Sequence, residues 1–286
     1  MAERALVIEC RDAELVGILH EPDHGAPSAG VVLIVGGPQY RVGSHRQFVL
    51  LARSLARAGV SCLRFDYTGM GDSGGEFVGF EGIEADVRAA IDRLLRESAG
   101  LRRVFLWGLC DAASAILMYA PTDERVAGVV IANPWVRSAQ GQAQAVVEQY
   151  YRRRVWSGEF WGKLLTGRVN VWGAARDFVR NWFVAHAPSS GRKEQSGQRT
   201  PFQERMLAGL ERFDHPVLLL TSGDDLTAAE FLALVASSPR WQHALDARHT
   251  QRQHLAEATH TFSTDRWRKQ VEQWTVTWLS QHRDAS

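Results

Sequence analysis

The chain has 286 residues, of which 45% are hydrophobic and 23% are charged, and its formal net charge is +1 at pH 7. This is the composition of an ordinary globular protein, long enough for one large α/β domain with an insertion. The cysteines at positions 10, 62 and 110 show neither paired nor metal-like spacing, which favours a reducing compartment. No apolar run approaches the ~18 residues of a membrane span, and the first ten residues lack a signal-peptide core. We therefore expect a cytoplasmic protein without stable membrane insertion or a nucleic-acid partner.

The first part of the chain predicts the edge of a sheet, followed by a buried strand. Residues 4–20 alternate loosely between apolar and polar and suit two antiparallel edge strands joined near residues 11–13. Residues 31–35 are a continuous β-branched run, as in a strand that is covered on both faces. The glycines and proline of residues 36–38 then mark a tight turn before a helix that begins near Phe48.

Residues 60–65 predict the next strand, and the loop after it carries Gly69, Gly71 and Gly74 at the G-x-G-x-x-G spacing. That spacing is also found in dinucleotide sites, where the third glycine already lies in a helix. Here the helical period begins only at Ile83. The loop therefore fits better the one that follows the fourth strand in α/β-hydrolases, and a dinucleotide site is the weaker alternative.

The central motif is V-F-L-W-G-L-C-D-A-A-S at residues 104–114, an apolar strand that leads into Gly108, Cys110 and a helix. This is the pattern of the α/β-hydrolase nucleophile elbow, with cysteine in place of serine. Small residues at positions 108 and 112 leave room for the tight turn, and the helix N-terminus favours a thiolate. The alternative is a buried core cysteine without a chemical role.

Residues 126–132 form a further apolar strand, after which the composition changes. Residues 135–213 contain 5 of the 10 tryptophans, and 13 Lys or Arg against 6 Asp or Glu. We interpret them as a helical cap inserted after the sixth core strand, with a flexible segment at residues 187–201, whereas residues 1–134 and 214–286 form the core. The positive excess fits an anionic acyl donor such as an acyl-CoA or a carrier-bound acyl group. Solvated helix faces, or peripheral contact with an anionic membrane at residues 152–154, are the alternatives.

Past the cap, residues 216–221 predict the seventh strand, and the turn after it holds Asp224 and Asp225. We prefer Asp225 as the catalytic acid, because hydrolase acids usually lie two or three residues beyond the turn glycine; Asp224 would then lie near the cap of the next helix. His260, in the polar loop before a terminal helix, completes the order nucleophile, acid, histidine. Histidines without such a context are expected at the surface: His20, His24, His186, His243, His249 and His282.

These residues predict a Cys110, His260 and Asp225 triad on an α/β-hydrolase fold, a mostly parallel, doubly wound sheet. The backbone amides of Asp111 and Gln39 are the expected oxyanion donors, since Pro38 has no N–H. Further residues are expected to line the substrate pocket: His45, Arg41 and Trp135. The sequence contains no pattern for a metal or a cofactor, and it leaves the oligomeric state open.

Five segments carry a resemblance to a known family: G-G-P-Q-Y-R-V-G-S-H-R-Q-F, F-D-Y-T-G-M-G-D-S, G-L-C-D-A-A-S, F-W-G-K-L-L-T-G-R-V-N and S-G-D-D-L-T-A-A-E-F. Together they resemble the cysteine-type α/β-hydrolases of bacterial exosortase and exopolysaccharide loci, called exosortase A system-associated hydrolase type one. The resemblance covers nearly the whole chain and implies a cytoplasmic enzyme acting on acyl groups in polysaccharide or protein-sorting chemistry. Cysteine in place of serine leaves acyl transfer to an alcohol or amine as an alternative to hydrolysis, and a non-catalytic binding protein as a second alternative.

Overall fold

The structure is a computed structural model that describes residues 2–23, 26–27, 29–37, 39–137, 200–247 and 250–282. The chain divides into two compact units, Met1–Val136 with Thr200–Ser286, and Arg137–Arg199. Apart from Arg137, the second unit lies outside the described residues, and with it most of the predicted cap. The basic residues proposed for anion or membrane contact lie there too, at positions 152–154.

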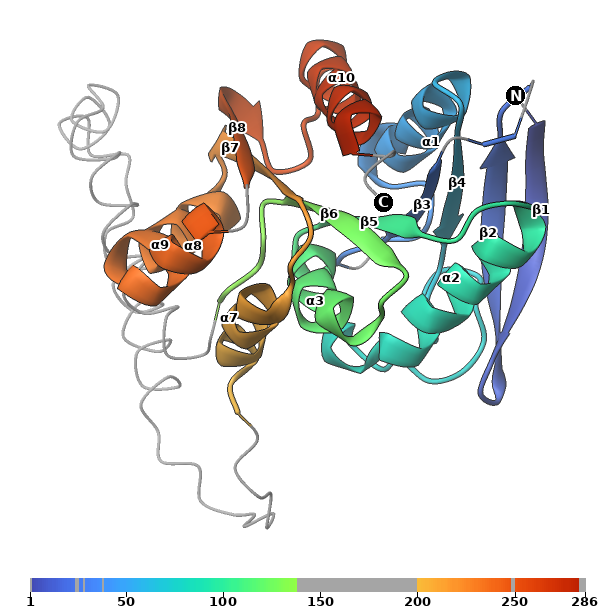
Figure 1. Cartoon of the computed structure of the whole chain (residues 1–286), viewed down its shortest axis with the longest axis horizontal. Helices are drawn as coiled ribbons and strands as arrows, with labels where there is room; N and C mark the ends of the chain where they lie inside the picture. The colour runs from blue at the N-terminus through green and yellow to red at the C-terminus, as the bar shows by residue number, and fades with distance from the viewer. Residues whose placement is uncertain are drawn as a thin grey trace, which may run out of the picture. The chain divides into compact units, whose positions relative to one another are not determined.

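In the described residues, eight strands form one sheet in the order β1-β2-β4-β3-β5-β6-β7-β8 (Figure 1). The strands are β1 (Ala2–Cys10), β2 (Ala13–Glu21), β3 (Ala29–Ile34), β4 (Val60–Phe65), β5 (Val104–Leu109), β6 (Val126–Ala132), β7 (Val217–Asp224) and β8 (Gln251–Thr259). Strand β2 pairs antiparallel with β1 and β4, and the pairs from β4 to β8 are parallel. The predicted edge hairpin is confirmed, and so are the predicted bounds of β4 and β6.

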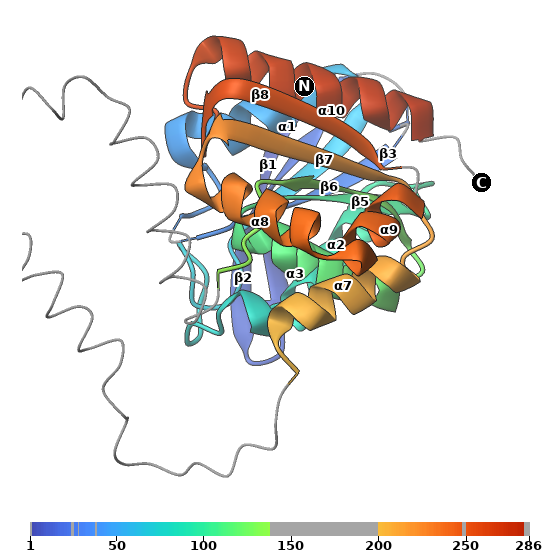
Figure 2. The same ribbon diagram turned by 90° about the vertical axis from the view of Figure 1, so that its left-hand side faces the viewer.

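Helices cover both faces of this sheet. On one face lie α1 (Gln47–Arg57) and α10 (Asp265–His282), and on the other α2 (Glu84–Glu97), α3 (Asp111–Tyr119) and α7 (Phe202–Arg212) (Figures 1 and 2). The strands alternate accordingly: Val31 and Leu33 of β3 belong to the apolar cluster beneath α1, whereas Val32 and Ile34 belong to the cluster beneath α2 and α3. Two-sided burial explains why these strands read as continuous apolar runs in the sequence.

Two elements after β7 were not predicted from the sequence. Helix α9 (Pro239–Ala247) follows α8 (Leu226–Ser237), and β8 pairs with β7 alone at the edge of the sheet. Most side chains of β8 are exposed or half-buried, so its sequence Q-R-Q-H-L-A-E-A-T carries no apolar alternation. Pairing of its backbone with a neighbour, rather than local hydrophobicity, holds this strand in the sheet.

Helix α7 lies within the core unit, although the sequence analysis assigned its residues to the cap. It packs against α3 so closely that a Cβ at Gly209 would lie 2.0 Å from the Leu117 carbonyl oxygen. Met206 and Leu210 of the helix are fully buried. The predicted end of the insertion at residue 213 therefore moves back to residue 199, because the amphipathic face of α7 packs on α3 in the core unit.

His20 is also placed differently from the expectation of a surface residue. It lies on β2 with no exposed surface, and its Nε2 accepts a hydrogen bond of 2.8 Å from Arg64 Nε of β4. Burial, followed by the charge of Arg64, lowers the pKa of His20 to about 4. A histidine in this environment remains neutral at physiological pH.

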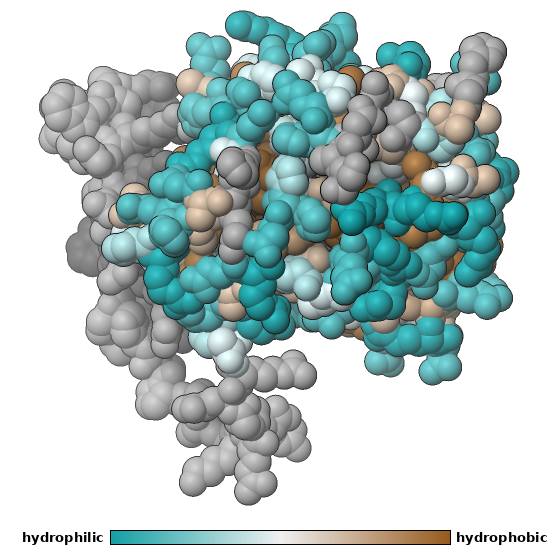
Figure 3. Space-filling view, viewed as in Figure 1, coloured by the Kyte–Doolittle hydropathy of each residue, from teal (hydrophilic) through white to brown (hydrophobic). Residues whose placement is uncertain are grey.

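On the face seen in Figure 3, teal hydrophilic residues predominate and brown apolar residues show mainly between them. Among the residues that the structure describes, no helix combines the length and the apolar character needed to cross a membrane.

Candidate active site

Cys110 occupies the turn between β5 and α3, in a backbone conformation that is rare for a residue with a side chain. Its φ is 65° and its ψ is −128°, outside the ordinary helical and strand regions. A Cβ at Gly108 would lie 2.7 Å from Ile116 Cδ1 and 2.9 Å from the Ala112 carbonyl carbon, so only glycine fits there. The close packing holds the strain of about 1–3 kcal/mol that such a conformation costs. The predicted strand, sharp turn and helix are thus present, with the thiol partly exposed.

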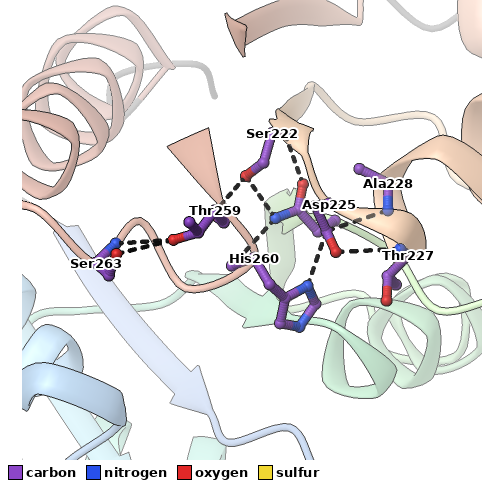
Figure 4. Close-up of polar contacts among 8 residues, drawn as sticks. Ser222, Asp225, Thr227, Ala228, Thr259, His260 and Ser263 are labelled. Carbon is purple, nitrogen blue, oxygen red and sulfur yellow. Dashed lines mark hydrogen bonds and ion pairs between the residues drawn. The ribbon is translucent and has the colours of Figure 1, made fainter. Parts of the chain in front are cut away.

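Asp225 and His260 come from the loops after β7 and β8 and meet at the same edge of the sheet as Cys110. His260 Nδ1 lies 2.8 Å from Asp225 Oδ2 (Figure 4). The Asp225 carboxylate also caps α8, accepting hydrogen bonds of 3.1 Å from the amides of Thr227 and Ala228. Asp224 is exposed and is the last residue of β7. The structure therefore brings Asp225, rather than Asp224, to the imidazole, and Asp225 is itself the helix cap.

The imidazole of His260 lies between a carboxylate and the thiol. Burial alone would lower the pKa of His260, but hydrogen bonds to Asp225 and Cys110, together with their charges, raise it to about 10. Since Nδ1 faces Asp225, Nε2 is the nitrogen left for the thiol. An imidazolium beside a sulfur stabilises the thiolate, which is the nucleophilic form of cysteine.

Asn133 supports this arrangement, and the sequence analysis missed it. It lies just after β6, fully buried, with a φ of 43°. Its Nδ2 donates hydrogen bonds of 2.9 Å to the His260 carbonyl oxygen and to Ser222 Oγ, and its Oδ1 accepts one of 2.9 Å from the Ser222 amide. The available signal was an asparagine ending a buried strand, since asparagine tolerates positive φ and its amide bridges neighbouring backbones.

On the opposite side of Cys110, the turn after β3 meets the start of α3. The Gly37 amide donates a hydrogen bond of 2.6 Å to Asp111 Oδ1. The Gln39 amide, predicted as an oxyanion donor, donates instead to the Gly37 carbonyl oxygen at 2.8 Å, and the Gln39 side chain accepts from Ser44. In this arrangement the N–H of Gln39 is already engaged, because the turn folds back on itself.

Arg41 is held by carboxylates and does not point freely into a pocket. Its guanidinium pairs with Asp66, which is fully buried, and with Asp72 at 2.7 Å, and its backbone amide donates to Asp66 at 2.5 Å. Asp66 also organises the glycine-rich loop, since a Cβ at Gly71 would lie 2.3 Å from its carboxylate. The position of Arg41 thus fixes the turn after β3 to the loop after β4, a role that the sequence did not indicate.

The other two predicted pocket residues differ in their distance from the nucleophile. The Trp135 amide donates a hydrogen bond of 3.2 Å to the Cys110 carbonyl oxygen, and the Trp135 carbonyl accepts one of 2.6 Å from Ser114 Oγ. Trp135 therefore borders the elbow. His45 is exposed on a single 3₁₀ turn, Ser44–Arg46, where its φ is 54°. Among the residues that the structure describes, no hydrogen bond or ion pair joins His45 to Cys110.

The dinucleotide alternative is not supported by the loop after β4. Helix α2 begins only at Glu84, well past Gly74, so no glycine of the motif opens a helix. The described residues also contain no group of three or more His, Cys, Asp or Glu side chains arranged to hold a metal ion.

Fold and site geometry define a member of the α/β-hydrolases. The chain belongs to the alpha/beta hydrolase family, whose model matches residues 31–274. This confirms the predicted fold class. No curated protein sequence matches the chain.

Several solved structures share this fold. An esterase from Pyrococcus furiosus superposes with a TM-score of 0.65 at 14% identity, covering 99% of this chain and 92% of that chain. Est1E from Butyrivibrio proteoclasticus, with ferulic acid bound, gives a TM-score of 0.63 at 15% identity over 97% and 99% of the two chains. The esterase domain of a Rhodothermus marinus protein gives 0.61 at 17% identity over 99% and 100%. At such identities these likenesses establish the fold alone.

Proposed function

We propose that this protein is a cysteine-dependent acyl-transfer enzyme that cleaves a thioester or an ester through an acyl-enzyme intermediate. The observation that carries the proposal is that Asp225 lies 2.8 Å from His260, which in turn contacts Cys110 in its strained turn. A cysteine that served only packing would need neither the positive φ nor a histidine paired with a carboxylate.

In the proposed reaction, Cys110 attacks the acyl carbonyl carbon as a thiolate, and His260 receives the thiol proton and passes it to the leaving group. Asp225 holds the imidazole tautomer and stabilises its positive charge. The Asp111 amide, at the N-terminus of α3, stabilises the oxyanion. The amide of Gln39 would join it only after leaving the Gly37 carbonyl.

The acyl-enzyme would be a thioester, which reacts readily with amines and alcohols as well as with water. This chemistry favours acyl transfer as a second candidate function, with the same residues in the same roles. The resemblance of the sequence motifs to exosortase-associated hydrolases supports a substrate in exopolysaccharide or protein-sorting metabolism in the cytoplasm. Trp135, beside the Cys110 backbone, supports an apolar acyl pocket at the elbow.

A panel of fluorogenic esters and acyl-CoA thioesters, assayed with and without alcohol or amine acceptors, tests these candidates. Turnover in water alone indicates a hydrolase, and turnover that depends on an acceptor indicates a transferase. Cys110→Ala should abolish both, and Cys62→Ala is the matched control. A native protein whose Cys110 forms no acyl-enzyme with any donor would instead be a binding protein on a hydrolase fold.

The donor is proposed to be anionic, because residues 135–213 carry 13 Lys or Arg against 6 Asp or Glu. Salt screens such attraction. Raising the salt concentration from ~50 to ~300 mM should therefore raise KM several-fold for an acyl-CoA and leave KM unchanged for a neutral ester of the same chain. Equal effects on both substrates would count against an anion site.

A further inference from the structure

The carboxyl group of Asp111, the residue after Cys110, binds the turn after β3. The Gly37 amide donates to its Oδ1 at 2.6 Å, across the gap between the turn after β3 and the elbow. At Gly36 the two segments come so close that a Cβ would lie 2.6 Å from the same oxygen and 2.1 Å from the Leu109 carbonyl oxygen. The contact is therefore built into the packing of two loops rather than made by a free surface side chain.

Two further amides, in the first turn of α3, face the same carboxyl group. Burial raises the pKa of the Asp111 carboxyl, whereas hydrogen bonds from the amides of Gly37, Ala112 and Asp111 itself, and the charge of His260, oppose that rise. Backbone N–H groups that converge at a helix N-terminus beside a nucleophile are the donors that acyl-transfer enzymes use for the oxyanion.

We propose that the Asp111 carboxyl group occupies the oxyanion site of the resting enzyme, and that the substrate carbonyl must displace it from the Gly37 amide before acylation. This inference rests on the proposed function and adds Gly37 to it as the second oxyanion donor, because the Gln39 amide is bonded to the Gly37 carbonyl. Asp111 then has two opposed effects. Its amide stabilises the oxyanion, whereas its carboxyl group competes with the oxyanion for the hydrogen bond of the Gly37 amide.

Displacement is coupled to the covalent step. As the thiolate of Cys110 forms the C–S bond, the π electrons of the substrate carbonyl move onto its oxygen. This oxyanion then accepts the hydrogen bond of the Gly37 amide in place of the Asp111 carboxyl group. Collapse of this adduct re-forms the C=O bond and expels the alkoxide or thiolate, which receives the proton of His260. Oxyanion donors are worth about 10²–10³ each in rate, so a carboxyl group that occupies one of them limits acylation substantially.

The experiment compares acylation with alkylation of the same thiol in wild type, Asp111→Ala and Asp111→Asn. Acylation is measured by the burst with a p-nitrophenyl ester, which needs the oxyanion site. Alkylation is measured with iodoacetamide, which needs the thiolate but forms no oxyanion. Asp111→Asn retains an oxygen that can accept from Gly37, and Asp224→Ala removes an exposed carboxylate as a charge control. Thermal melts check that each variant is folded.

Asp111→Ala should raise the acylation rate about tenfold, which is a part of the rate enhancement that one oxyanion donor provides. The rate of alkylation should rise much less. Asp111→Asn should fall between wild type and Asp111→Ala, and Asp224→Ala should match wild type. An aldehyde that forms a hemithioacetal with Cys110 should bind about tenfold more tightly to Asp111→Ala, for the same reason.

Equal increases in acylation and alkylation would overturn the inference, because the carboxyl group would then act only on the charge of the thiol. Slower or unchanged acylation in Asp111→Ala would also overturn it, while a burst in wild type would leave the proposed function intact. Absence of an acyl-enzyme in every variant, with Cys110 still alkylated, would contradict the proposed function itself.

Discussion

Two histidines of the core unit, one on a strand and one in the turn after a strand, are fully and partly buried, respectively, yet their protonation is opposite. His20, on β2, is fully buried beside the guanidinium of Arg64, and burial and that charge lower its pKa to about 4. His260 follows β8, where burial again lowers the pKa, but Asp225 and Cys110 raise it to about 10. Burial alone therefore does not decide the charge of a histidine in this protein; the sign of its hydrogen-bonded neighbour does.

The contrast separates a structural histidine from a chemical one. His20 accepts a hydrogen bond from Arg64 and stays neutral. Arg64 also donates a hydrogen bond of 3.2 Å to the Arg41 carbonyl oxygen, which links this pair to the turn after β3. His260 is positioned to carry a proton at neutral pH, between an acid and a nucleophile. The same side chain thus serves packing near one edge of the sheet and, in the proposed mechanism, proton transfer near the other.

Removal of the carboxylate beside His260 should have the largest effect. Asp225→Asn should lower the acylation rate by about 10⁴-fold, as expected when the acid of a triad loses its charge and the imidazole its tautomer. It should also bring the pKa of His260 down, which the NMR titration of its ring protons measures. Asp224→Asn, an exposed neighbour, is the matched control and should change both values little. The reverse pattern would assign the acid to Asp224.

The next effect is on the thiols. The thiolate is the nucleophilic form of cysteine, so a partly exposed thiol beside the imidazole of His260 should react faster with iodoacetamide at pH ~6.5 than the two buried thiols. Peptide mass mapping should find Cys110 labelled first, because burial raises the pKa of Cys10 and raises that of Cys62 to about 12.

His260→Ala should remove most of this advantage, since it withdraws the cation beside the sulfur. His254→Ala is the matched control, because His254 on β8 bonds to Thr221 Oγ1 at 2.9 Å and not to the thiol. If Cys110 were inert in the native protein, or if its labelling ignored His260, the proposed triad would be wrong.

The neutral histidine should be detected through stability. Because the pKa of His20 falls from about 6.5 unfolded to about 4 folded, the unfolded chain binds the extra proton between those values. The contribution of His20 to the free energy of unfolding is thus fully present above pH ~6.5 and is lost as the pH falls toward 4. Between pH 7 and 5 this loss amounts to about 2 kcal/mol. For His260 the sign is opposite: its contribution is present below pH ~6.5 and is lost as the pH rises toward 10.

Urea unfolding of wild type and His20→Gln at pH 7 and 5 measures the difference. His20→Gln should reduce the acid sensitivity, while His243→Gln, on the exposed face of α9, should not. An unchanged acid dependence in His20→Gln would mean that other groups govern acid unfolding.

The smallest expected effect concerns Asn133, which follows β6 and holds the carbonyl of His260 after β8, two strands away in the sheet. Asn133→Asp retains the size of the side chain and its tolerance of a φ of 43° but loses the donor to His260. We expect about a tenfold loss in acylation rate, in line with the sensitivity of catalysis to small displacements. The pH dependence of acylation should shift with it, whereas a purely structural role would lower the melting temperature and leave the pH profile unchanged.

Much of the fold followed from local signals in the sequence. The buried strands β4 and β6 were predicted at their observed bounds, because a strand covered on both faces is mostly apolar along its whole length. The elbow was also local, since Gly108, Cys110 and Ala112 are small or reactive residues at a fixed spacing between a strand and a helix. The pairing of Asp225 with His260 was expected from their order after Cys110 in the chain, which is the order nucleophile, acid, histidine of the α/β-hydrolases.

The remaining features depend on partners that are distant in the sequence. The polar strand β8 is held by backbone pairing with β7, and α7 is held by its packing against α3. The charge of a histidine, as for His20 and His260, and the partner of a backbone amide, as for Gly37, are set by neighbours that are distant in the sequence; Gly37 and Asp111 are 74 residues apart. The sequence by itself determined the periodicity, the turns and the order of reactive residues, since these are local properties. Only the tertiary structure decided burial, hydrogen-bond partners and the sign of nearby charge, because these arise where separate segments meet.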